Sequence, residues 1–223
     1  MVVSATPGVP AHELNSFWRR LMEQAGVDGV DKVVSLVNSG QLVLVPPARW
    51  YEENGVIYFK VDFTDQPTDG SVWIDRLTKQ GVSMGVYARS VLMSSFFSSN
   101  FKPVGITSPI KVAVIKGVSF AGSKRTTCNV QAKAEKLGLI EPTAGLACLT
   151  REMFPDDALK DMGLRQIVVM HKPIRDSGNF MDRLGVTRRC SCYNDVGLSL
   201  SVFKEEGSDR RWWRGTGFAY FVR

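Results

Sequence analysis

The sequence predicts an α+β protein, and three observations support this prediction. Apolar side chains recur at helical spacing through most of the first 100 residues. A single clear strand pattern interrupts them. The second half shows the order strand, helix, helix, strand, which differs from the regular alternation that builds a parallel sheet. We therefore expect a small α-rich domain with a short β element over residues 1–100, and an antiparallel sheet with two helices over residues 101–223.

The elements of the first half follow from periodicity. Apolar side chains on one stripe predict helices, whereas a run rich in β-branched and aromatic residues predicts a strand at 55–63. The predicted helices span residues 12–22, 28–38, 68–81 and 84–93. The serine-rich segment 94–100 has neither pattern, and we expect it to be the linker between the two domains.

The second half alternates more clearly between strands and helices. A helix over 126–137 is predicted to begin at a threonine N-cap and to end before Gly138. Segment 172–197 has no regular pattern and is expected to be irregular. The other predicted elements are strands at 110–116, 166–171, 198–203 and 217–222, and helices at 143–154 and 156–163. An unpaired terminal strand would fray, so we expect the last strand to pair with the first one of this half.

Length and composition exclude several classes of protein. The chain has 223 residues, of which 44% are hydrophobic and 22% charged, as in an ordinary globular protein. Its apolar runs are much shorter than the ~20 residues that a membrane helix needs. The N-terminus has no secretory-signal pattern, so we expect a cytoplasmic protein without a membrane span, leaving a non-classical export route open.

Sequence motifs of common enzymes are absent. The chain has no nucleophile elbow, Walker loop, dinucleotide fingerprint or zinc-protease motif, and only two histidines. His171 is expected to be an ordinary strand-end residue and Cys148 a small core residue. Cys190 and Cys192 form C-x-C, which differs from the C-x-x-C of zinc and redox sites, and we expect reduced thiols. We therefore expect no catalytic residues, no metal site and no cofactor.

The positive charge of the chain lies in its second half. The first 100 residues carry 8 basic and 10 acidic side chains, whereas residues 101–223 carry 20 and 12. A solvated basic surface explains this distribution, and so does an acidic partner or nucleic acid.

The C-terminal 40 residues have the composition of a binding surface. Arginine, tryptophan, tyrosine, serine and asparagine are concentrated there, as in many recognition surfaces. Successive side chains of an extended segment point in opposite directions, so Trp212 and Trp213 cannot both face the core. One of them is expected to be exposed, or to be covered by Arg210 or Arg214.

Several stretches resemble a family of uncharacterised proteins from ultra-small candidate-phylum bacteria. The resemblance covers residues from about 70 to 223 and rests on segments 73–77, 87–92, 147–154, 161–164, 167–174, 211–214 and 217–220. Members of that family differ mainly near the C-terminus, which is similar to the variable proteins of diversity-generating retroelements. The resemblance implies a C-type lectin fold for residues 101–223, related in shape to formylglycine-generating enzymes.

In that class, adenine-directed mutagenesis rewrites a C-terminal surface that binds a macromolecular ligand. The resemblance thus implies a non-enzymatic protein that binds another macromolecule, in the first place a protein. The implied ligand-binding residues are Arg189, Cys190, Cys192, Tyr193, Asn194, Leu200, Val202, Phe203, Asp209, Arg210, Trp213, Gly215 and Thr216. One alternative is a nucleic-acid-binding protein that uses the arginine and tryptophan clusters. Another is an enzyme of the formylglycine-generating type, for which Cys190 and Cys192 are the candidate thiols.

Overall fold

The computed structural model describes residues 22, 29–38, 49–103, 105, 108–175, 178–188, 199–204 and 211–223. The chain divides into two compact units, Met1–Ala48 and Arg49–Arg223. In the first unit, helix α2 (Val30–Asn38) confirms the helix predicted at 28–38. The helix predicted at 12–22 lies outside the described residues except for Met22.

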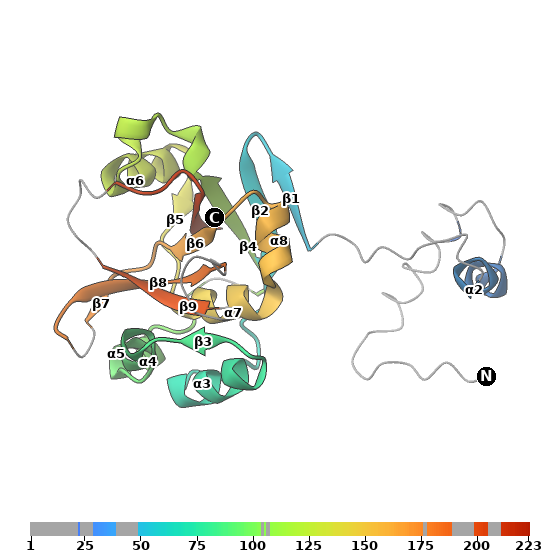
Figure 1. The fold of residues 1–223 in the computed structure, drawn as a ribbon, viewed down its shortest axis with the longest axis horizontal. Helices are drawn as coiled ribbons and strands as arrows, with labels where there is room; N and C mark the ends of the chain where they lie inside the picture. Colours follow the sequence, from blue (N-terminus) through green and yellow to red (C-terminus); the bar gives the residue numbers. More distant parts are fainter. Residues whose placement is uncertain are drawn as a thin grey trace. The chain divides into compact units, whose positions relative to one another are not determined.

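The second unit is a mixed α+β structure with one large sheet, which confirms the α+β prediction at this level (Figure 1). Its strands are β1 (Trp50–Glu53), β2 (Val56–Val61), β3 (Ser83–Met84), β4 (Ile110–Lys116), β5 (Leu139–Ile140), β6 (Gln166–Val169), β7 (Ile174–Arg175), β8 (Met181–Thr187), β9 (Ser199–Lys204) and β10 (Thr216–Val222). Its α-helices are α3 (Gly70–Lys79), α4 (Val86–Leu92), α5 (Ser95–Ser99), α6 (Thr127–Lys136), α7 (Gly145–Met153) and α8 (Asp156–Asp161).

The ten strands described in this unit form one sheet, in the order β1-β2-β4-β10-β6-β8-β9-β3. Strand β5 pairs with β10, and β7 pairs with β8. As predicted, the last strand pairs antiparallel with the strand at 110–116, with Phe218 opposite Ile115. The expectation of a purely antiparallel sheet is wrong, because β10 pairs parallel with β6 and β3 pairs parallel with β9.

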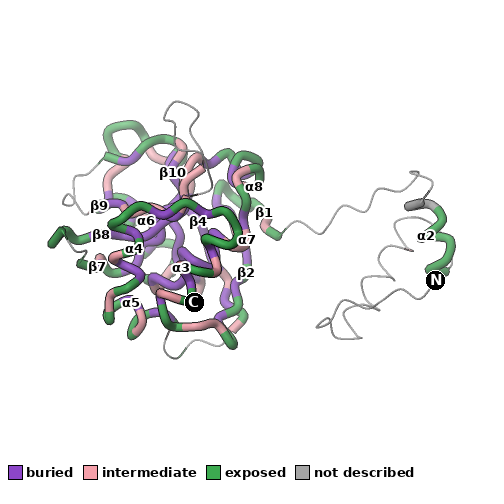
Figure 2. Tube along the Cα trace, turned by 60° about the horizontal axis from the view of Figure 1, so that its bottom comes forward, coloured by how far each residue is buried: buried purple, intermediate pink, exposed green. Residues whose placement is uncertain are grey.

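The sheet has an apolar core on each of its faces. On β10, Phe218 and Tyr220 belong to one core, and Ala219 and Phe221 belong to the other. Helix α6 covers the first core, whereas α3, α4, α5, α7 and α8 cover the second (Figure 1). Strands β4, β8 and β10 are therefore buried along most of their length (Figure 2).

The predicted domain boundary at residue 100 is wrong. Strand β2 pairs with β4 over six residues, so the hairpin of the first half belongs to the large sheet. Segment 94–100 is also no linker, because it contains helix α5, whose Phe97 is fully buried. The ring of Phe97 lies 5.6 Å from that of Phe101, which stacks on Trp73. These aromatic contacts join α3 and α5 to the sheet in one core.

The segment predicted to be irregular contains two strands. Strand β8 pairs antiparallel with both β6 and β9, so it is an inner strand of the sheet. Its sequence includes Asp182, Arg183 and Gly185, which break the apolar alternation that predicts a strand.

The caps of the helix predicted at 126–137 are confirmed. The Thr126 side chain accepts a hydrogen bond from the backbone N–H of Asn129, and Gly138 follows the helix at φ +67°. None of the helices in the described ranges is long and apolar enough to cross a membrane.

Two neighbouring phenylalanines on α5 allow a matched test of this core. Phe97→Ala is expected to lower the free energy of unfolding by about 3–5 kcal/mol, because it opens a cavity in a fully buried site. Phe96→Ala, at a 45% exposed position, is expected to change it by about 0.5 kcal/mol or less. Urea unfolding followed by circular dichroism measures both. Equal, small effects would show that 94–100 is a linker after all.

Candidate functional site

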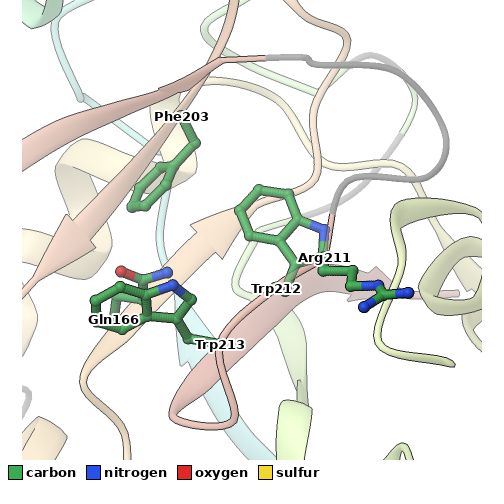
Figure 3. Close-up of a pocket in the computed structure, with 5 residues that line it drawn as sticks. All are labelled: Gln166, Phe203, Arg211, Trp212 and Trp213. Atoms are coloured by element: carbon green, nitrogen blue, oxygen red, sulfur yellow. The ribbon is translucent and has the colours of Figure 1, made fainter. Parts of the chain in front are cut away.

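A pocket opens on the face of the sheet that α6 covers. Its volume is about 220 Å³, and Gln166, Phe203, Arg211, Trp212 and Trp213 line it (Figure 3). Gln166 begins β6 and Phe203 lies near the end of β9, while the other three residues immediately precede β10. The pocket therefore joins the second-last strand of the chain to the segment that leads into the last one.

The two adjacent tryptophans have opposite environments. Trp212 is 4% exposed, and its ring lies 5.6 Å from Phe218 and 6.1 Å from Phe203. Its indole N–H donates a hydrogen bond to the Thr127 hydroxyl at 3.1 Å. Trp213 is 64% exposed. The expected division between one core and one exposed tryptophan is confirmed.

Among the described residues, the cation over Trp213 is Arg165, whereas Arg210, one of the two predicted residues, lies outside the described ranges. The Arg165 guanidinium lies 5.1 Å from the centre of the Trp213 ring, in the place expected for Arg210 or Arg214. Arg165 immediately precedes β6, and its backbone N–H donates to the Gly215 carbonyl at 2.8 Å. This backbone contact holds the start of β6 beside the turn that carries Trp213.

Gly185 on β8 provides room for the Phe203 ring. A Cβ atom at residue 185 would lie 2.8 Å from the ring of Phe203 and 2.4 Å from the Ile167 carbonyl oxygen. Only glycine allows the ring to lie this close to the sheet. Phe203 consequently forms a fixed wall of the pocket, and is 9% exposed.

Arginines gather around this pocket. Arg211 lines it, Arg165 covers Trp213, and Arg214 is exposed next to Trp213. The Arg188 N–H donates to the Arg165 carbonyl at 2.8 Å, which places a fourth arginine beside them. Within the described ranges, none of these four guanidiniums has a carboxylate partner within 4.0 Å. Among the described residues, the charged side chains around the pocket are therefore positive.

Hydroxyl and amide groups extend along the same face of the sheet. The Gln166 amide donates to the Thr216 hydroxyl at 3.0 Å, and the Thr187 hydroxyl donates to Ser201 at 3.2 Å. The hydroxyls of Ser199 and Ser201 are 3.3 Å apart. The half-buried hydroxyls of Thr187, Ser199 and Ser201 give the face beside the pocket hydrogen-bonding capacity.

The sequence-predicted site residues fall into four groups. Phe203 and Trp213 line the pocket together, and Gly215 adjoins Arg165 at the same end of the sheet. Leu200 and Thr216 are buried, so the expectation that they are displayed outward is wrong. Val202 is half-buried and packs against the opposite core, because alternate residues of β9 face opposite sides. The residues outside the described ranges are Arg189, Cys190, Cys192, Tyr193, Asn194, Asp209 and Arg210.

Several residues of this site are not among the predicted ligand-binding residues. Gln166 and Arg211 line the pocket, and Arg165 covers Trp213. Gln166 had a signal, because it is a polar residue at the start of an otherwise apolar strand. Arg165 had none, since its proximity to Trp213 depends on the parallel pairing of β6 with β10.

His171 and Cys148 are structural, as predicted. The His171 ring donates through Nδ1 to the Lys172 carbonyl at 2.6 Å and accepts at Nε2 from the Leu184 N–H at 2.8 Å. The pKa of His171 is lowered to about 4, mainly by burial; the hydrogen bond to the Lys172 carbonyl raises it in part, and the charge of Arg183 lowers it. Burial raises the pKa of the Cys148 thiol far above its usual range, which makes this thiol unreactive.

The tryptophan pair yields a direct stability test. Trp212→Ala is expected to lower the free energy of unfolding by about 3–5 kcal/mol, because it removes a buried ring and leaves the Thr127 hydroxyl without this donor. Trp213→Ala is expected to lower the free energy of unfolding by no more than about 1 kcal/mol, which is the contribution of an exposed cation–π contact. Denaturant unfolding of the two variants measures the difference. Similar losses would contradict the assignment of Trp213 to the surface.

His171 predicts a loss of stability in acid. Its folded-state pKa of about 4 lies below the ordinary value of about 6.5, so the unfolded state binds the proton more tightly. The corresponding stability, about 3 kcal/mol, is present above about pH 6.5 and lost as the pH falls towards 4. We expect His171→Gln to flatten the pH dependence of the unfolding free energy in this window. Parallel curves for the two proteins would refute the assignment.

Comparisons with known proteins give no match from which a function of this surface could be inferred. No protein-family model, curated protein or solved structure matches the chain. Within the described ranges, no group of three or more histidine, cysteine, aspartate or glutamate side chains is placed to hold a metal ion. The features that carry a functional argument are the aromatic pocket, the arginines around it and the half-buried hydroxyls beside it.

Proposed function

We propose that this chain is a non-enzymatic binding protein of the type diversified by retroelements, and that its C-terminal surface binds a macromolecular ligand. The observation that carries the proposal is Trp213, a large aromatic side chain that is 64% exposed beside a pocket and four arginines. Tryptophan and arginine are the residues most enriched in the energetic centres of protein interfaces. Trp213 combines both kinds of side chain at one place, because the Arg165 guanidinium lies over its exposed ring.

The scaffold beneath this surface supports the proposal. Phe218 and Tyr220 are buried under Trp212 and α6, and Ala219 and Phe221 are buried on the other face of the same strand. Folding therefore depends on interior residues. Substitution of exposed residues usually changes stability by only about 0.5 kcal/mol, so such a surface can be rewritten while the fold persists.

The C-type lectin-like fold is part of this proposal. The closing strand pairs with the strand that precedes α6 and α7, in line with the strand, helix, helix, strand order that the resemblance implies. We assign the proposed domain to Arg49–Arg223, because the β1–β2 hairpin and α3–α5 share its sheet and core. The variable positions in segments 189–194 and 209–210 remain predictions.

A nucleic-acid-binding function is the second candidate. Its support is the stacking of Arg165 on Trp213 next to Arg188, Arg211 and Arg214, since cationic and aromatic groups together bind single strands. Such binding releases counterions, so it would weaken steeply with salt. Binding of a protein through the pocket would depend less on salt.

If the surface is diversified, we expect a near-copy of the gene's 3′ end close to the gene, and tolerance of substitutions at exposed positions of the protein. The gene's neighbourhood is expected to contain a reverse transcriptase and a near-copy of the gene's 3′ end, with mismatches only at adenines. In a saturation library sorted for folded protein, position 213 is expected to accept most residues, whereas Trp212 and Phe218 are retained, because only these two are buried. A missing near-copy would refute diversification. A library intolerant at 213 would refute a replaceable surface.

A further inference from the structure

The pocket and the arginines around it restrict the chemistry of the ligand. We propose that the pocket takes a single apolar side chain of a protein ligand, and that carboxylates flanking this side chain bind the surrounding arginines. This inference rests on the proposed binding function and adds the class of ligand, an acidic peptide segment with an apolar anchor residue.

The size of the pocket favours one side chain. Pockets that enclose small molecules usually measure about 300–1,000 Å³, whereas this one measures about 220 Å³. A space of this size suits an aromatic or aliphatic side chain that projects from a larger partner. Binding energy at protein interfaces concentrates on such inserted anchors.

Three of the five residues that line the pocket are aromatic, and the other two are Gln166 and Arg211. Phe203 and Trp212 are both almost fully buried and form its fixed sides, and Trp213 borders it from the solvent side. Gln166 adds one amide, which is already hydrogen-bonded to Thr216. An apolar group that fills this space removes aromatic surface from water and displaces no tightly held polar partner.

The positive charge at the pocket comes from three arginines. In Figure 3 the Arg211 side chain extends away from Phe203 and Trp213, so its guanidinium lies to one side of the aromatic rings. Arg165 lies over Trp213, and Arg214 follows Trp213 in the chain. A ligand with carboxylates beside its anchor residue would therefore meet guanidiniums near the pocket. Arginine binds carboxylates with two parallel hydrogen bonds, which adds specificity to the attraction of charge.

The aromatic geometry favours a peptide over nucleic acid. Single-stranded nucleic acids bind by stacking successive bases on exposed rings. Here Phe203 and Trp212 are 9% and 4% exposed, so neither presents a free ring face. Trp213 is the one exposed ring of the three, and Arg165 lies over it. The rings can form the walls of a pocket for one inserted side chain, but they do not form a platform for consecutive bases.

Random copolymers provide the probe for this proposal. In calorimetric titrations of the full chain, poly(Glu,Tyr) is expected to bind, because it offers aromatic anchors next to carboxylates. Poly(Glu), which lacks the anchor, is expected to bind at least about tenfold more weakly. Poly(Lys,Tyr) is expected not to bind, because its charge repels the arginines.

Matched variants separate the pocket from general attraction to a basic protein. Arg211→Gln and Trp213→Ala are each expected to weaken poly(Glu,Tyr) binding about tenfold. Lys79→Gln removes an exposed positive charge on α3, and Tyr87→Ala removes a 45% exposed ring on α4. Both controls are expected to change the affinity by less than about twofold. Thermal unfolding of each variant verifies that it folds.

Three results would overturn the proposal. The first is absence of poly(Glu,Tyr) binding, and the second is binding that Arg211→Gln and Trp213→Ala leave unchanged. The third is tighter binding of oligothymidylate at the same residues, with a steep salt dependence, which would assign the surface to nucleic acid. The first two results would reject an acidic peptide as the ligand. They would not decide whether the surface is diversified, which the search for the near-copy of the gene and the saturation library test separately.

Discussion

The pairing of β10 on both of its edges is the constraint on which the rest of this structure depends. The strand is antiparallel to β4 and parallel to β6, and it supplies side chains to the cores on both faces of the sheet. Its first residues pass so close to their neighbours that a Cβ at Gly217 would lie 2.6 Å from the Val114 side chain. The turn before it is closed by a hydrogen bond from the Thr216 N–H to the Trp213 carbonyl at 3.1 Å. This fixed backbone buries Trp212 and leaves Trp213 in solvent.

The same constraint explains how one end of the sheet can hold a rigid core and an exposed surface side by side. Parallel pairing brings the start of β6 next to the start of β10, and hence Arg165 next to Trp213. Antiparallel pairing of β8 with β6 adds Arg188 at the same end. Guanidiniums repel one another, and among the described residues no carboxylate lies within 4.0 Å of the four around the pocket.

Most single elements could be predicted from the sequence, because local patterns determine them. The threonine cap at 126 and the glycine at 138 delimit α6, and alternation of apolar residues marks β4 and β10. Strand β8 was missed because its central position in the sheet allows Asp182 and Arg183 to be buried among partners from other strands. Helix α5 was missed for a related reason: its five residues are too few for a periodic signal, and the burial of Phe97 depends on Phe101 and Trp73.

For the candidate site, the sequence by itself determined which kinds of side chain are present, because aromatic and arginine residues are concentrated near the C-terminus. It also determined that the two adjacent tryptophans have different environments, because neighbouring side chains of an extended chain point in opposite directions. Only the tertiary structure decided which tryptophan is exposed, that Leu200 and Thr216 are interior, and that Gln166 and Arg165 join the site. The physical reason is that these contacts come from strand pairing between segments about 40 to 50 residues apart, whose order and direction no local pattern encodes.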